Sequence, residues 1–472
     1  MGGTTNRGYS FLDLKLDHTF KSDTKVVLSG ILEHSDILVD IELKSSEQSQ
    51  SNAGNSQDEP REITKRFEKK TTKVRPKELY IKQDFFKISS LSYGYQKVVL
   101  GQFEPFSPSN FAMPWNLSSL AVGLNKVDNT LSQEAATIDL YPTSQVQLSF
   151  YYFPKLTYDP LITEELNDIL AEQEGKVESE KAVIALPKGP DAAQNMVRFM
   201  LYPSWGTIGF TYYNGYHSSF PAVRAKIKEK RHLNGDGTLS WRDYEKYNEM
   251  WSFAKNEMFS FEMAVPVGRF TWKLEYARHS DLTDLSSSAY NARGKHGSAY
   301  SGKITPEADE LFRAIRDIND GNVAIPFTRD IAALGFTADL EKWYINFMLL
   351  HMGERFEGNA KKLKDLEKKA KQSGQNDDDG DDDFLVVMPG LVASRYLDSN
   401  RENKIGLGFG MIGPGFGLLL FYNKQTDSFS YGAGIQAISY LSNESIEESL
   451  PEGYELSNEM TAGAMFNISY NF

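Results

Sequence analysis

The sequence predicts one transmembrane β-barrel, an antiparallel up-and-down sheet of about 18 strands with short turns at one end and long, partly helical loops at the other. Three observations predict it. Hydrophobic residues recur with period two, the pattern of a strand with one apolar face. The alternating segments are about ten residues long, enough to cross a bilayer as tilted strands. The connections between them alternate between very short and very long.

Composition excludes several other classes of protein. The 472 residues include no cysteine, 12% aromatic residues, and 64 acidic against 51 basic residues, for a net charge of -13. The aromatic content argues against a disordered chain, and the acidic excess argues against a general nucleic-acid binder. The longest apolar run, Gly410 to Tyr422, is broken by Pro414 and is shorter than the about 20 residues of a membrane helix. The absence of cysteine excludes thiol catalysis, thiolate metal sites and disulfides.

The alternation separates an apolar face from a polar face in each segment. In 145–154, Val146, Leu148, Phe150 and Tyr152 share one face. Apolar faces often end in an aromatic residue, as an interfacial girdle requires. The opposite faces carry charged residues and glycine, which suits a wet lumen better than the core of a soluble β-sandwich. Five charged residues are expected to project into this lumen: Asp139, Arg198, Glu262, Lys273 and Glu275.

The predicted strands span 8–18, 24–33, 36–45, 78–92, 96–104, 134–142, 145–154, 195–203, 206–217, 257–266, 269–279, 328–339, 341–353, 384–396, 403–412, 415–423, 428–441 and 459–472. Tight turns are expected at 34–36, 94–95, 143–144, 204–205, 267–268 and 340. The whole chain, 1–472, forms a single barrel, and its long loops span 46–77, 105–133, 155–194, 218–256, 280–327, 354–383 and 442–458. An even number of strands separates each long loop from the next, so all emerge on one side. Both chain ends then lie on the short-turn side; if the first two segments form a tail, about 16 strands are left.

The C-terminal segment alternates up to the last residue, with Phe466, Ile468, Tyr470 and Phe472 on one face. An aromatic final residue preceded by alternating apolar residues resembles the signal by which the assembly machinery recognises bacterial outer-membrane barrels. The resemblance implies a bacterial outer-membrane location, with the barrel assembly machinery, the lipid bilayer and a lipopolysaccharide-type outer leaflet as partners. The chain begins Met-Gly-Gly-Thr-Thr-Asn, with no basic region followed by an apolar run, so either the protein is never exported or a signal peptide has been removed. The barrel pattern favours removal of a signal peptide.

A second segment is similar to part of the substrate-diffusion porins. It runs from Glu78-Leu79-Tyr80-Ile81 through Gly101-Gln102-Phe103 to Pro105-Phe106-Ser107-Pro108-Ser109-Asn110. In those families a strand that ends in such a step is followed by an Asn/Pro-rich loop, which often folds into the barrel and narrows it. The resemblance implies a constriction loop, with Phe106, Phe111, Trp115 and Asn116 as the constricting residues. Gln102 stands where a basic residue is common, so no anion preference carries over.

The segment from Arg231 to Tyr247 reads RHLNGDGTLSWRDYEKY and partly matches a calcium-binding EF-hand loop. The candidate ligands are Asn234, Asp236, Thr238 and Asp243. His232 replaces the usual first carboxylate, and Asp243 replaces the bidentate Glu, so calcium would bind weakly. The alternative is a glycine turn that enters a surface helix. No cofactor is required, and calcium in the loops is the one that the sequence suggests.

Helices are expected in three of the long loops: after Thr163, from Thr305-Pro306-Glu307, and over about 358–372. The second carries an apolar stripe of Leu311, Phe312, Ile315 and Ile318. Apolar stripes outside a barrel need a covering partner. The helices either pack on each other as a cap or dock a second protein. The acidic run Asn376 to Asp383 predicts a solvated loop, with nonspecific binding of divalent cations as the alternative.

The seven histidines lie in no catalytic motif. Arg278-His279-Ser280-Asp281 lacks the amide and glycine context of barrel phospholipases, so we expect no enzyme. The expected function is a porin-like channel for passive diffusion of small hydrophilic solutes or ions, with modest ion selectivity from its mixed lumen charges. The alternative is a structural barrel whose outer loops bind or anchor a surface protein. Homo-oligomers are a further expected form of partnership, and nucleic acid is not an expected partner.

Overall fold

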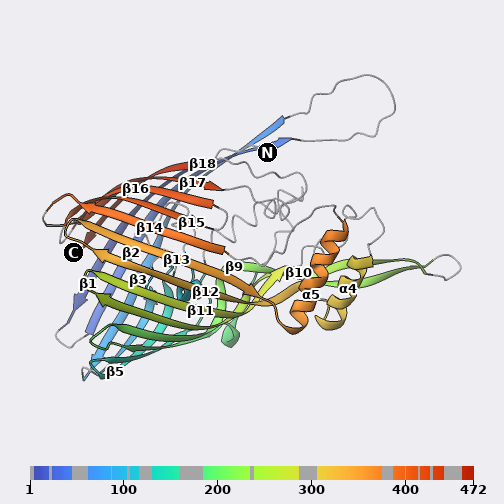
Figure 1. The fold of residues 1–472 in the computed structure, drawn as a ribbon, viewed down its shortest axis with the longest axis horizontal. Coiled ribbons are helices and arrows are strands. Elements are labelled where there is room, and N and C mark those ends of the chain that lie inside the picture. Colours follow the sequence, from blue (N-terminus) through green and yellow to red (C-terminus); the bar gives the residue numbers. More distant parts are fainter. Residues whose placement is uncertain are drawn as a thin grey trace.

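The structure, a computed structural model, describes residues 5–20, 24–44, 62–86, 88–103, 107–115, 130–158, 184–233, 239–285, 306–374, 386–398, 400–412, 415–425, 429–440 and 460–471. These residues are mostly β-sheet, and the two α-helices lie beyond one end of it (Figure 1). The short turns lie at the opposite end. The predicted fold class, an antiparallel up-and-down barrel with unequal connections, is confirmed.

Most strands form where the alternation predicts them, because period-two patterns place one apolar side chain on the outer face at every second residue. In chain order they are β1 (Thr5–Thr19), β2 (Thr24–Lys44), β3 (Glu62–Phe85), β4 (Ser89–Gln96), β5 (Gln133–Thr143), β6 (Val146–Phe153), β7 (Ile184–Ala185), β8 (Gln194–Leu201), β9 (Thr207–Leu233), β10 (Leu239–Val267), β11 (Phe270–Leu285), β12 (Ala324–Asp339), β13 (Trp343–Arg355), β14 (Val386–Tyr396), β15 (Asn403–Ile412), β16 (Gly415–Gln425), β17 (Phe429–Tyr440) and β18 (Met460–Asn471).

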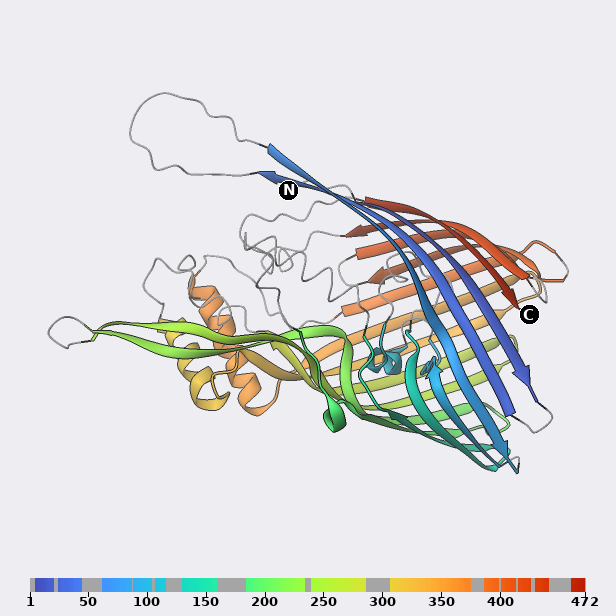
Figure 2. The same ribbon diagram turned by 180° about the vertical axis from the view of Figure 1, so that it is seen from behind.

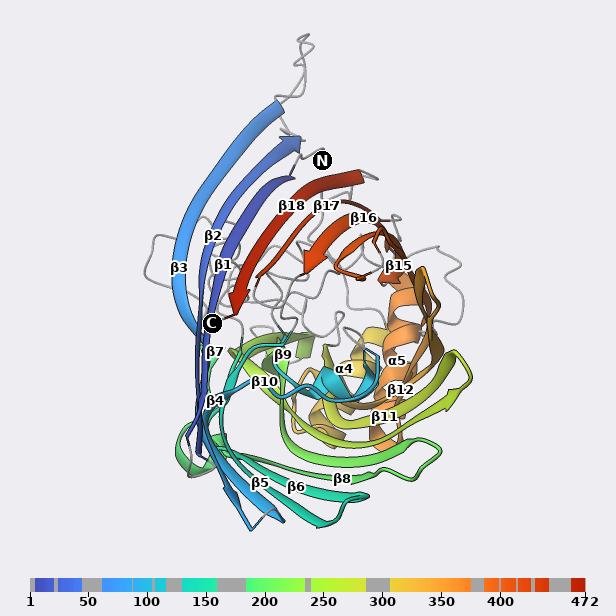
Figure 3. The same ribbon diagram turned by 90° about the vertical axis from the view of Figure 1, so that its left-hand side faces the viewer.

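Each long strand pairs antiparallel with the next one along the chain, and β6 pairs with β8. The sheet has 18 strands when β7 is counted, but β7 is two residues long and pairs only with β10 among the described strands. The first and last strands also pair, in parallel, with Leu12 opposite Ile468. Viewed along its axis, the sheet forms a ring (Figure 3). Because β1 and β18 run in the same direction, they start at the long-loop end and finish at the short-turn end. The expectation that both ends of the chain lie at the short-turn end is therefore wrong.

Four predicted features near the N-terminus are wrong, and the first of them explains this change. The turn expected at 34–36 does not form, since β2 runs through it and pairs with β3 over its whole length. The alternation stays in phase there, with Val27, Ile31 and Ile37 all at odd positions. The predicted strand 78–92 is divided between β3 and β4 by a turn at Phe86, which has a left-handed φ of 51°. The turn expected at 94–95 lies within β4, and of the predicted strand 96–104 only Gln96 belongs to the sheet, since 97–103 leave it.

Two predicted loops are partly strand. β9 and β10 continue through the predicted loop 218–256 as a long hairpin that projects beyond the ring (Figure 2). The pairing shifts register at three places along this hairpin, between Leu239 and Trp241, Tyr247 and Met250, and Phe253 and Lys255. β3 likewise begins inside the predicted loop 46–77. The predicted loop 442–458 lies outside the described residues.

Two of the predicted loop helices are confirmed, as α4 (Pro306–Ile318) and α5 (Gly358–Gly374). Their apolar stripes pack on each other, with Leu311, Phe312 and Ile315 of α4 against Leu363 and Leu366 of α5. Val323 and Ile325 complete this cluster. Of the two expected arrangements, the structure therefore has the helices packed as a pair beyond the barrel rim. The helix expected after Thr163 lies outside the described residues.

The outer face of the ring is apolar. On β15 and β16, Ile405, Leu407, Leu418 and Leu420 are exposed, whereas Gly406 and Gly408 between them are buried. The same holds around the ring, where Ile81, Ile138, Phe150, Trp272, Leu334 and Leu391 are all more than a third exposed. Among the described residues, no helix is both long and apolar enough to cross a bilayer.

The contact between α4 and α5 can be tested at Leu363, which is 1% exposed. Leu363→Ala should destabilise the pair by about 2–5 kcal/mol, because the substitution leaves a cavity. Amide hydrogen exchange should accelerate in 306–318 and 358–374 while the strands of the ring keep their protection. Lys361→Ala, at an exposed position of the same helix, is the control. Equal exchange in both variants would contradict the helix contact.

Candidate functional site

The connection between β4 and β5 turns into the barrel. Its described residues are 97–103, 107–115 and 130–132, and they include the short helix η1 (Pro108–Ala112). In the axial view η1 lies inside the ring of strands (Figure 3). It packs against β9, β10 and β11. We call residues 97–115 the inward loop.

One side of the inward loop is apolar and packs on the inner wall. Val98, Leu100 and Met113 are buried among Phe153, Met196, Met258 and other residues of β5 to β11. Apolar burial of this kind contributes roughly 25 cal/mol per Å² removed from water. The loop therefore lies against one wall rather than across the middle of the bore.

Phe103 fixes the loop at a second place on the wall. Its ring is buried with Ile331, Ala333 and Leu350 of β12 and β13. A side chain at Gly335 would come within 2.9 Å of this ring, so glycine is needed there for the close approach. The ammonium of Lys273 lies 5.8 Å from the centre of the Phe103 ring.

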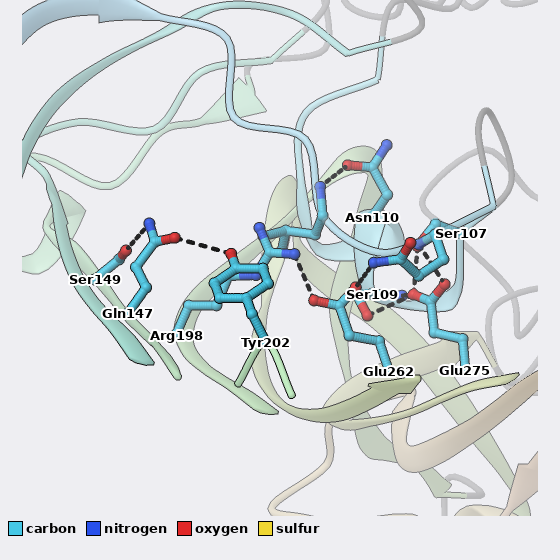
Figure 4. A network of polar contacts seen from close by, with 11 residues as sticks. Ser107, Ser109, Asn110, Gln147, Ser149, Arg198, Tyr202, Glu262 and Glu275 are labelled. Carbon is cyan, nitrogen blue, oxygen red and sulfur yellow. Dashed lines mark hydrogen bonds and ion pairs between the residues drawn. The ribbon is translucent and has the colours of Figure 1, made fainter. Parts of the chain in front are cut away.

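Glu275 of β11 receives four hydrogen bonds from the inward loop (Figure 4). The backbone N–H groups of Gln102 and Ser109 donate to its carboxylate at 3.1 and 3.0 Å, the Ser109 hydroxyl donates at 2.6 Å, and the Ser107 hydroxyl donates as well. Glu275 is 0% exposed. A carboxylate removed from water is costly unless donors surround it, and here the loop supplies all four.

Glu262 of β10 is the second anchor, at 3% exposed. The guanidinium of Arg198, from β8, forms an ion pair with it. The side-chain amide of Gln102 donates to its other oxygen at 3.3 Å. Lys273 donates to the carbonyl oxygen of Gln102 at 2.9 Å. Gln102 thus contacts Glu262, Lys273 and Glu275 together, which ties the loop to β10 and β11.

Gly101 allows the loop to make these contacts. Its φ is +81°, a conformation that residues with a side chain rarely adopt. A Cβ at this position would lie 2.2 Å from Oε1 of Glu275. Gly101 is therefore required both by the backbone turn and by the close approach to the carboxylate.

Neutral hydrogen bonds complete the attachment. Nε2 of His279 donates to the carbonyl oxygen of Pro108 at 3.1 Å, and Nδ1 lies 3.2 Å from the side-chain amide nitrogen of Asn256, which donates to it. Within the loop, Asn110 accepts from the backbone N–H of Leu100 at 3.3 Å and donates to Thr130 at 2.9 Å. The indole N–H of Trp115 donates to the carbonyl oxygen of Asn110.

All five charged residues predicted for the lumen lie on inward-facing positions, but the structure gives them different surroundings. Arg198, Glu262, Lys273 and Glu275 gather under the inward loop and hold it. Asp139 lies apart, where Ser90, Ser149 and Gln147 donate to its carboxylate. The loop residues that meet these charges, Gly101, Gln102, Ser107 and Ser109, belong to the porin-like segment, but sequence reasoning assigned them no role.

The predicted constriction residues are described only in part. Phe111 and Trp115 lie on the inward loop with ring centroids 4.6 Å apart, and both are partly buried. Phe106 and Asn116 lie outside the described residues. The aromatic pair belongs to the part of the loop that enters the ring, as a constriction requires.

The described residues include only part of the predicted calcium site and of the C-terminal signal. Asn234, Asp236 and Thr238 lie outside the described residues, and Asp243 lies in β10 opposite Lys230. The segment from Leu239 onward is strand, so the surface helix considered as the alternative does not form there. Among the described residues, no cluster of His, Asp and Glu could hold a metal. Phe466, Ile468 and Tyr470 lie in β18, and Phe472 falls beyond the described residues.

No protein-family model matches the chain, and no curated protein matches it. Solved structures with similar folds include OccAB1 from Acinetobacter baumannii, at 9% identity, 99% of this chain, 95% of that chain and a TM-score of 0.40. OccK7 from Pseudomonas aeruginosa is 8% identical over 92% of this chain and 88% of that chain, with a TM-score of 0.39. A BenF-like porin from Pseudomonas fluorescens is 7% identical over 99% and 93%, with a TM-score of 0.31. Because these TM-scores are below 0.5, the fold assignment rests on the strand pairing itself.

The role of Glu275 as an anchor can be tested by Glu275→Ala. The substitution removes four hydrogen bonds to a charged group, each worth about 1.5–3 kcal/mol, and leaves the loop donors without partners. Proteolysis and hydrogen exchange of 97–115 should increase strongly, while the strands keep their protection. Glu341→Ala, at an exposed short turn, is the control. A loop that stays protected in Glu275→Ala would show that the apolar contacts alone hold it.

Proposed function

We propose that the chain is a channel in the bacterial outer membrane through which small hydrophilic solutes diffuse passively. One observation carries this proposal: an apolar outer face and a polar inner face are combined with a loop that is fastened inside the ring. An exposed apolar surface this extensive is unusual for a soluble protein and fits contact with lipid. A loop that narrows the bore gives an upper size to what can pass.

The outer face also supports the position of the bilayer. Exposed aromatic residues lie near the short turns, among them Trp205, Trp272 and Trp343, as expected at a membrane interface. Near the other end, exposed Tyr93 and Tyr212 donate to Glu134 and Glu257 at 2.7 and 2.6 Å. Lys155 forms an ion pair with Glu134 at 2.9 Å. Polar groups therefore begin on the outer face at the level of these tyrosines.

The scaffold alternative was suggested by apolar stripes on loop helices. In the structure the apolar stripe of α4 is covered by α5, so a second protein is not needed to bury it. No other observation on the described residues favours a scaffold over a channel. We therefore propose the channel alone.

Reconstitution of the purified chain tests the proposal. In planar bilayers it should give stable current steps, and in liposomes the rate of swelling should fall as the neutral solute becomes larger. Glu275→Ala should give larger and noisier steps, because the loop that narrows the bore is released, whereas Glu341→Ala should match the original chain. A barrel that inserts but carries no current and co-purifies with another protein would contradict the channel and support the scaffold.

A further inference from the structure

A partly open cavity lies beside the start of the inward loop. Its volume is about 260 Å³, and it lies between the inner faces of β3 to β6 and the start of the loop. The lining residues are Glu78, Tyr80, Lys82, Ser92, Gln96, Lys97, Val98, Val99, Thr137, Asp139 and Tyr151. Pockets for drug-sized ligands begin at about 300 Å³, so this cavity suits a molecule with a single ring.

The charges in this cavity balance each other. Glu78 and Asp139 are acidic, and Lys82 and Lys97 are basic. Asp139 already accepts hydrogen bonds from three side chains, and Lys82 lies 3.7 Å from Asp84. A bound ion of either sign would be attracted by two of these side chains and repelled by the other two. The cavity therefore has no net Coulomb preference for an ion.

The same groups suit a solute with many hydroxyls. Ammonium and amide groups donate to hydroxyl oxygens, and carboxylates accept from hydroxyl hydrogens. Thr137 is 4% exposed and its hydroxyl has no hydrogen-bond partner among the described residues, although it lines the cavity. A buried hydroxyl without a partner is unfavourable, so Thr137 favours a polar rather than an apolar neighbour at this side of the cavity. Tyr80 and Tyr151 add aromatic surface for the apolar side of a ring.

From this lining we infer that the cavity is a binding site on the permeation path for a small, neutral, polyhydroxylated solute of single-ring size. The inference deepens the proposed function and rests on it. Binding here is weak enough to allow release, since the contacts are hydrogen bonds that water also makes. The site gives the channel a preference within the solutes that its bore admits.

The test compares three single-ring probes of nearly equal size: glucose, which is neutral, glucuronate, which is an anion, and glucosamine, which is a cation. Each is added to single channels that carry a potassium chloride current. Glucose should interrupt the current in a saturable way, with a higher apparent affinity than either charged probe. Stronger interruption by glucuronate or glucosamine would overturn the inference. A channel that conducts ions but responds to none of the three would overturn it too, and leave the proposed function standing. The absence of any current would overturn both.

Variants locate the site. Thr137→Val keeps the shape of the side chain and removes its hydroxyl, and Tyr80→Leu removes a ring. Each should weaken the glucose interruption about tenfold, which corresponds to about 1.4 kcal/mol. Lys342→Met, at an exposed short turn, should leave it unchanged. The current without glucose verifies that each variant forms a barrel. Unchanged interruption in both Thr137→Val and Tyr80→Leu would place the site elsewhere and overturn the inference.

Discussion

The inward loop depends on the burial of two carboxylates in the barrel wall. Glu275 and Glu262 lie where water is excluded, and a carboxylate in such a place must find donors within the protein. The loop provides them from its backbone and from Ser107, Ser109 and Gln102. The dependence is mutual, because the backbone N–H groups of Gln102 and Ser109 need acceptors once the apolar side of the loop is packed. The wall therefore supplies acceptors for the loop, and the loop supplies donors for the wall. Without the other, each would bury polar groups that have no hydrogen-bond partner.

This reciprocity explains why the loop lies to one side of the bore. The carboxylates are on β10 and β11. From the same part of the loop, Phe103 packs against β12 and Leu100 packs in a cluster that includes β5. The wall formed by β3 to β6 stays open along the cavity. Four of the predicted lumen charges are thereby committed to structure. The charges that line the cavity are a different set, on β3, on β5 and at the start of the loop.

Period-two alternation was sufficient to predict most of the strands from β5 to β18, since a lipid face and a polar face impose it on every residue. The alternation did not predict the structure where the local sequence is compatible with more than one arrangement of the chain. In 24–44 the phase is unbroken, so only the pairing with β3 shows that no turn occurs. In 96–104 the apolar residues alternate as in a strand, yet they pack on the inside of the wall. The inward direction of Glu262 and Glu275 was predictable, but their contacts with the loop join residues more than 150 positions apart, and no local pattern shows them.

The strength of the attachment bears on how such a channel selects its solutes. Four hydrogen bonds to Glu275, one hydrogen bond from Gln102 to Glu262 and two apolar contacts hold the loop. With about 1.5–3 kcal/mol for each hydrogen bond to a charged group, full release of the loop by thermal motion is rare. In the proposed channel, a bore of fixed width would sort solutes by size without a moving gate. Any preference among solutes that fit would then come from weak contacts with the residues that line the cavity, including Lys97 at the start of the loop.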